Sequence, residues 1–170
     1  MLATFFVGIS DAWWMTKHTR HHGNPNQVGK DPGIRPRIIS YRDEDAATRT
    51  GPITWITRRH GWFIFPLLLL FGIELHRASL HGLFARRPVK GRALEVTLLT
   101  TRVTIYLGLL FWLLPFGMAW AFLGVQLAVF GVYMGTSFAP NHIAMSIVPA
   151  DAGLDLLDKE VLAPRNVRGG

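Results

Sequence analysis

Apolar residues fill a long stretch in the second half of the chain, and charged residues are excluded from it. No Asp, Glu, Lys or Arg occurs from Val103 through Ala150. Such a run is long enough for two membrane crossings of about 20 residues each. We therefore predict a transmembrane helical hairpin over residues 96–139, with its turn at Pro115 and Gly117 and with Arg102 reaching the membrane surface near the entry of the first helix.

A third apolar stretch, residues 62–75, is shorter and contains Pro66. If it crossed the bilayer, the basic residues in segment 77–102 would lie opposite those in segment 17–59, against the positive-inside rule. We therefore expect residues 61–84 to form an interfacial or re-entrant helix. All 18 Lys and Arg residues then lie on one face of the membrane, the cytoplasmic face.

The remaining segments are one short apolar run and two polar regions. The run from Leu2 to Ile9 lacks the basic start and the cleavage site of a signal peptide, so we expect residues 1–14 to be the end of a truncated apolar helix. Residues 15–60 are expected to form a cytoplasmic region, and residues 140–170 a cytoplasmic tail with a short amphipathic helix near residues 154–162. The pattern as a whole predicts an all-α membrane protein with a transmembrane hairpin, interfacial helices and a cytoplasmic histidine region.

Composition excludes several kinds of site. The 170-residue chain has no cysteine, which rules out disulfides, thiolate metal sites and thiol nucleophiles. Its formal net charge of +7 would suit nucleic-acid binding, but the basic residues flank apolar segments and no binding fold accompanies them. We expect these residues to follow membrane topology and to meet anionic lipid head groups. The predicted partner is a lipid bilayer, not a nucleic acid.

Candidate chemistry is concentrated in three histidines, His18, His21 and His22, within one turn of a predicted helix. Positions i, i+3 and i+4 lie on one helix face, so the three imidazoles are expected to face a common point, and imidazole binds iron, zinc and copper alike. The alternative is a solvated basic face, because Lys17 and Arg20 are interleaved with the histidines. A zinc protease is disfavoured, since no general-base Glu stands inside the motif.

A fourth histidine, His142, follows the second helix of the predicted hairpin. An even number of crossings between His22 and His142 returns the chain to the same face of the membrane, so His142 can meet the first cluster. His60, His76 and His81 are expected to be solvated or interfacial residues.

Several segments together resemble the membrane-bound fatty acid desaturases, particularly the bacterial acyl-lipid or acyl-CoA type. They are Trp13-Trp14, the histidine box from His18 to His22, the following residues 23–32 (Gly-Asn-Pro-Asn-Gln-Val-Gly-Lys-Asp-Pro), residues 137–142 (Ser-Phe-Ala-Pro-Asn-His) and the tail 161–170. The resemblance covers nearly the whole chain. It implies a non-haem di-iron enzyme that uses oxygen and two electrons to introduce a double bond into an acyl chain.

The resemblance also implies a ligand set, a partner and missing parts. By the pattern of the family, His18, His21 and His22 are iron ligands from the middle histidine box, and His142 is the additional ligand after the last span. An electron donor such as ferredoxin, with its reductase, would dock on the same cytoplasmic face. No histidine precedes His18 and none follows His142. The first and last boxes therefore have no counterpart, and we expect a fragment of a desaturase, with a second polypeptide as one source of the missing boxes.

Four histidines are too few for a di-iron pair, since each iron usually takes several protein ligands. The chain alone is therefore expected to be inactive. Two alternatives stay open. A related di-iron membrane hydroxylase or ketolase shares the histidine boxes and differs in its product, whereas a non-catalytic membrane remnant or a metal-binding subunit would hold one metal or none.

Overall fold

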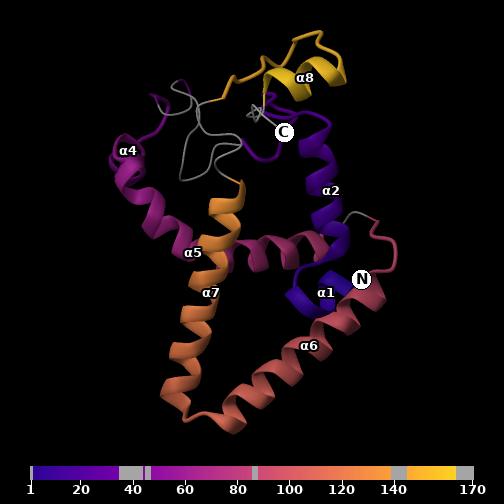
Figure 1. The fold of residues 1–170 in the computed structure, drawn as a ribbon, viewed down its shortest axis with the longest axis vertical. Helices are drawn as coiled ribbons and strands as arrows, with labels where there is room; N and C mark the ends of the chain where they lie inside the picture. Colours follow the sequence, from indigo (N-terminus) through magenta and orange to yellow (C-terminus); the bar gives the residue numbers. More distant parts are fainter. Residues whose placement is uncertain (1, 35–43, 45–46, 86–87, 139–144, 164–170) are drawn as a thin grey trace, which may run out of the picture. The chain divides into compact units, whose positions relative to one another are not determined.

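The computed structural model describes residues 2–34, 44, 47–85, 88–138 and 145–163. Within these residues the chain forms helices and no strand, as Figure 1 shows: α1 (Leu2–Val7), α2 (Asp11–His22), α4 (Pro52–Arg58), α5 (His60–Phe84), α6 (Arg92–Leu113), α7 (Phe116–Phe138) and α8 (Leu156–Leu162). The predicted all-α class is confirmed.

The chain divides into two compact units, each of which combines segments far apart in the sequence. The first unit consists of residues 1–16 and 68–134, and the second of residues 17–67 and 135–170. The boundaries fall inside α2, α5 and α7, so each of these helices belongs to both units.

Within the described residues, three helices are long and apolar enough to cross a membrane: residues 61–84 of α5, then α6 and α7. The predicted hairpin over residues 96–139 corresponds to α6 and α7. Helix α5 has 25 residues and continues through Pro66, so its length does not favour an interfacial position. The assignment of residues 61–84 as an interfacial or re-entrant helix stays a prediction that rests on the distribution of charge.

The turn between α6 and α7 lies at Leu114 and Pro115 (Figure 1). Leu114 is extended, with φ −117° and ψ 142°, because the ring of a following proline disfavours the helical conformation in the residue before it. Pro115 then begins the next helix through its carbonyl oxygen, which accepts the N–H of Ala119 at 2.9 Å. Gly117, expected in the turn, lies in the first turn of α7.

Helices α5 and α7 approach each other closely in the first unit, at Gly72 and Gly131. A Cβ added at Gly72 would lie 2.2 Å from the carbonyl oxygen of Leu127, and one added at Gly131 would lie 2.4 Å from the carbonyl oxygen of Leu68. Small residues allow helix backbones to come this close in membrane proteins. The two glycines therefore set the spacing of this helix pair.

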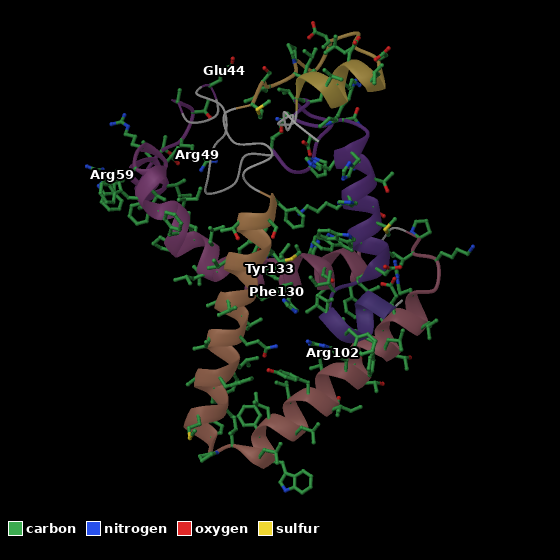
Figure 2. All side chains as sticks on the ribbon, viewed as in Figure 1. Glu44, Arg49, Arg59, Arg102, Phe130 and Tyr133 are labelled. Carbon is green, nitrogen blue, oxygen red and sulfur yellow. The ribbon has the colours of Figure 1, made fainter. Side chains whose placement is uncertain are left out.

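Beside this contact, the His76 ring packs edge-on against Phe130 of α7, with ring centroids 5.6 Å apart; Phe130 is labelled in Figure 2. His76 Nδ1 also lies 2.8 Å from the carbonyl oxygen of Gly72, one turn earlier in α5. Its imidazole is thus half-buried and used in helix packing.

The expected apolar helix over residues 1–14 is broken in the structure, since α1 ends at Val7 and α2 begins at Asp11. Gly8 lies in the break with φ +82°, a conformation that glycine adopts without steric cost. A Cβ at Gly8 would lie 2.6 Å from Nη1 of Arg102 on α6. Arg102, labelled in Figure 2, therefore lies against this break, and its guanidinium carbon is 5.3 Å from the centre of the Tyr106 ring.

A buried carboxylate from α6 holds the start of α2. Glu95 is 1% exposed and accepts hydrogen bonds from the Ala12 backbone N–H at 2.8 Å and from the Ser10 hydroxyl. Ser10 is also the N-cap residue, because its Oγ accepts the N–H of Trp13 at 3.1 Å, while its own N–H donates to Ser79 Oγ at 2.6 Å. The first N–H groups of a helix have no partner within it, so Ser10 and Glu95 together satisfy two of those of α2.

Trp13, part of the conspicuous Trp-Trp pair, packs on α5 within the same unit. A Cβ added at Gly82 would lie 2.1 Å from Cδ1 of Trp13. The indole therefore occupies the space that a larger residue at position 82 would fill. Gly82 and Trp13 thus make a close contact between α2 and α5.

In the second unit, the loop after α2 is fastened to residues that follow α7. Gln27 and Val148 form a parallel β-bridge, in which the Val148 N–H donates to the carbonyl oxygen of Asn26 at 3.0 Å. The buried side chain of Asn26 donates from Nδ2 to the carbonyl oxygen of Ala163 at 2.9 Å, and that of Gln27 donates to the carbonyl oxygens of residues 149 and 150 at 3.3 Å. Two buried amide side chains thus join segments more than a hundred residues apart.

The other helices of this unit have their own local signals. Pro52 stands at the start of α4, where a missing N–H has no cost. Asp155 caps α8, since its Oδ1 accepts the N–H of Asp158 at 2.7 Å, and the short helix expected near residues 154–162 is confirmed. The guanidinium carbon of Arg59, labelled in Figure 2, lies 4.8 Å from the centre of the Trp55 ring.

The buried Glu95 contact predicts a large loss of stability on Glu95→Ala. The substitution leaves the Ala12 N–H and the Ser10 hydroxyl without their acceptor, and the expected decrease in the free energy of unfolding is about 2–4 kcal/mol. Glu95→Gln keeps one acceptor oxygen and should lose less. The measurement is SDS-induced unfolding of the purified chain in mixed micelles. Glu74→Gln, which changes a half-exposed pair with Arg77, is the control and should cost at most about 1 kcal/mol.

The close approach of α5 and α7 predicts opposite effects for two glycines of α7. Gly131→Ala forces a methyl group against the Leu68 carbonyl and should decrease the free energy of unfolding by about 1–3 kcal/mol. Gly124→Ala adds a methyl group where nothing lies within 4 Å and should be neutral or stabilising by up to about 1 kcal/mol. The same SDS titration measures both. Equal stability of the two variants would show that the helices do not pack at Gly131.

Candidate metal centre

The three histidines of the box lie in the last turns of α2, as the spacing predicts. The helix carries Asp11 in its first turn and Arg20, His21 and His22 in its last, an arrangement of charge that suits the helix dipole. It ends where the Asn24 N–H donates to the carbonyl oxygen of His21 at 3.0 Å. The three histidines therefore lie on a regular α-helix, and a loop follows the helix directly.

The structure brings two of the imidazoles together and holds the third by another contact. The rings of His18 and His22, one turn apart, have centroids 4.4 Å from each other, and those of His21 and His22 are 5.7 Å apart. His21 Nδ1 lies 2.8 Å and 2.9 Å from the two carboxylate oxygens of Asp31. His142, the fourth predicted ligand, lies outside the described residues.

Partial burial is the largest of the effects that lower the pKa of His18; the nearby His22, His21 and Lys17 lower it further. A lowered pKa keeps the imidazole neutral to lower pH. Neutral imidazole is the form that binds metals, because the ring nitrogen must have a free electron pair. The electrostatics of the box thus favour the form of His18 that a metal requires.

Asp31 is the residue that sequence analysis missed. It is fully buried, and besides His21 its carboxylate accepts the backbone N–H groups of Asn26 at 2.8 Å and Gly33 at 2.6 Å. A Cβ at Gly33 would lie 3.0 Å from Oδ1 of Asp31 and 3.2 Å from Nδ1 of His21, so the loop leaves little room beside the pair. The only sequence signal was the Lys-Asp-Pro segment ten residues after His21. Contacts within a loop follow no periodic pattern, so the pairing of Asp31 with His21 could not be predicted.

The donor types fit a transition metal, since imidazole suits iron and a buried carboxylate commonly orients a metal-binding histidine. The number of donors does not suffice. Across the part of the chain that the structure describes, no group of three or more His, Asp or Glu side chains is placed to hold a metal ion. The ligand set of His18, His21, His22 and His142 therefore stays a prediction.

Comparison with known proteins supplies the family. A family model described as fatty acid desaturase matches residues 1–169. No curated protein and no solved structure matches the chain. The matched region includes the histidine box, the Asp31 loop and all three apolar helices. Because the match extends over nearly the whole sequence, the chain belongs to the fatty acid desaturase family.

Proposed function

We propose that this chain is part of a di-iron fatty acid desaturase, to which it contributes the middle histidine box and the membrane helices. The family match over residues 1–169 carries the proposal. The reaction removes one hydrogen from each of two adjacent carbons of an acyl chain, and O2 with two electrons and two protons becomes two molecules of water. Iron, when bound, would pass electrons to O2 and so activate it for this step.

The proposed iron ligands in this chain are His18, His21, His22 and His142. Two observations support the first three: they lie within one stretch of α2, and Asp31 engages one of their rings from a buried position. For His142 the support is indirect. Val148, six residues further along the chain, forms the β-bridge with Gln27 in the loop that follows the box.

Two irons need further ligands, because each iron usually takes several protein ligands. Only four of the seven histidines of the chain are assigned as ligands. His76 packs within the helices, and His81 is exposed on the last turn of α5. We propose that the remaining ligands come from outside this sequence of 170 residues, for example from a second polypeptide. The histidine region would be complete only in that assembly.

The membrane part of the proposal rests on the outer surface of α6 and α7. Large apolar side chains are exposed near the turn between these helices, among them Trp112 (81%), Leu113 (72%) and Phe116 (73%). Such a surface is stable in contact with lipid and would be costly in water. A bilayer is therefore the proposed surrounding of these helices, and the acyl substrate is a molecule that shares that environment.

The proposed electron donor is an acidic protein such as ferredoxin, acting with its reductase. The chain carries 18 Lys and Arg residues against 11 Asp and Glu, and the stretch from Val103 through Ala150 contains none of them. Concentration of positive charge on one face attracts an acidic partner and speeds its association. We propose that this is the cytoplasmic face, which also carries the histidine box.

The proposed topology predicts that Thr50 and Lys90 lie on the same side of the membrane. Both positions are exposed and stand before α4 and before α6. Because the chain has no cysteine, single substitutions Thr50→Cys, Lys90→Cys and Gly117→Cys can be labelled without background. In spheroplasts an impermeant maleimide should label Gly117→Cys alone, and lysis should expose the other two. Labelling of Thr50→Cys and Lys90→Cys from opposite sides would show that α5 crosses the bilayer.

The proposed ligand set predicts that His21→Ala lowers iron content and that His81→Ala does not. The first variant removes a ligand, whereas the second changes an exposed residue of α5. Each full chain is purified from membranes of a host supplied with iron and ferredoxin, and iron is measured by mass spectrometry. We expect His21→Ala to retain about a tenth of the wild-type iron content or less, since loss of a ligand costs at least as much as loss of a ligand's hydrogen-bond partner. Equal loss in both variants would overturn the ligand assignment.

Acyl products in the host lipids separate the proposal from its alternatives. New monounsaturated chains that appear once the missing ligands are supplied, and disappear with His21→Ala, support a desaturase. Hydroxylated or keto products would instead identify the related hydroxylase or ketolase. A wild-type chain that holds no iron under any of these conditions would favour a non-catalytic membrane remnant.

A further inference from the structure

Asp31 is surrounded by hydrogen-bond donors. Its two oxygens accept the backbone N–H of Asn26 at Oδ2 and of Gly33 at Oδ1, and both lie within 2.9 Å of Nδ1 of His21. An ionised carboxylate is a pure acceptor, whereas a protonated one carries an O–H that must itself find an acceptor. Two backbone N–H donors, one on each oxygen, therefore suit an ionised Asp31.

An ionised Asp31 determines which nitrogen of His21 carries the proton. A neutral imidazole has one N–H and one nitrogen with a lone pair. Because Nδ1 faces two carboxylate oxygens and no donor hydrogen belongs to them, Nδ1 must be the protonated nitrogen. The lone pair then lies on Nε2, the nitrogen through which the ring can bind a metal.

We propose that Asp31 is a positioning residue that holds His21 with Nδ1 protonated and so presents Nε2 to the metal. This inference rests on the proposed function, since it assigns a role to Asp31 through a predicted ligand. Backbone N–H groups of the loop of residues 26–33 donate hydrogen bonds to the carboxylate. The buried side-chain amides of Asn26 and Gln27 hold this loop in place. The orientation of one ring is thereby connected to a folded loop.

A purely structural role for Asp31 is the competing explanation, because its contacts with Asn26 and Gly33 also close the loop. The two roles differ in what they do to the imidazole. If Asp31 only closed the loop, its loss would lower stability and would not by itself change the tautomer of His21. A positioning residue fixes the tautomer, and its loss changes the tautomer even where the chain stays folded.

Asp31→Asn is the variant that separates these roles. Asparagine has the same shape, but one of its two terminal groups is an NH2 that donates. It therefore cannot accept from both backbone N–H groups and from His21 at once. Asp151→Asn is the matched control, since Asp151 is exposed in the same unit and the substitution removes the same charge.

The first measurement is the tautomer of His21 in the full chain in detergent, without metal, by NMR of 15N-histidine. The His21 signals are those that vanish in His21→Asn. We expect the wild type and Asp151→Asn to show Nδ1 protonated, and Asp31→Asn to shift His21 toward Nε2 protonated. A wild-type His21 protonated at Nε2 would overturn the proposal, and this result does not depend on whether Asp31→Asn folds.

The second measurement is titration of the same chains with Co2+ alone. We expect Asp31→Asn to weaken Co2+ binding by about 10-fold to 100-fold relative to wild type and Asp151→Asn. If His21→Ala weakens binding and Asp31→Asn does not, the positioning role is wrong while the ligand assignment stands. If neither variant changes binding, or the wild type takes up no Co2+, the proposed function loses its support, and the tautomer measurement still decides on Asp31.

Discussion

The hydrocarbon of a bilayer admits neither unpaired backbone groups nor unpaired charges without a cost of several kcal/mol, and this constraint orders the whole chain. It explains why α6 and α7 are uninterrupted helices of 22 and 23 residues. It also explains why no charged residue occurs between Val103 and Ala150. The histidine box lies outside the three apolar helices, on α2.

Helix α2 has contacts with buried carboxylates near both of its ends, each within its own unit. At the start, Glu95 accepts the Ala12 N–H and completes a cap that Ser10 begins. Near the end, Nδ1 of His21 lies 2.8 Å from the Asp31 carboxylate. Both carboxylates are almost completely buried, which is tolerable only because donors surround them. The helix that carries the proposed ligands thus contacts Glu95, 83 positions from Ala12, near its start, and Asp31, in the loop that follows it, near its end.

The sequence predicted those features that depend on local pattern. The exclusion of charge from residues 103–150 was enough to identify the hairpin, and the spacing of His18, His21 and His22 was enough to place them together on a helix. Pro115 marked the turn of the hairpin because proline restricts the residue before it. These signals are local, so one stretch of sequence contains all the information that each of them requires.

Features that depend on distant contacts were not predicted. The break at Gly8 lies in an apolar run whose sequence predicts a continuous helix. The Arg102 guanidinium that packs at this break comes from α6, so the local sequence does not reveal it. Asp31 was known only as part of a motif. Its pairing with His21 depends on how a loop folds back, and no periodic pattern reveals such a return.

The proposed centre would concentrate positive charge. Histidine ligands are neutral, so two ferrous ions bound by imidazoles alone would leave about four positive charges in a partly buried region. A buried carboxylate one hydrogen bond from a ligand offsets part of this charge without occupying a coordination position. Asp31, held by backbone N–H groups within the folded loop, is such a carboxylate. On the proposed function it would therefore both orient His21 and reduce the electrostatic cost of the metal, two effects that act through the same hydrogen bond.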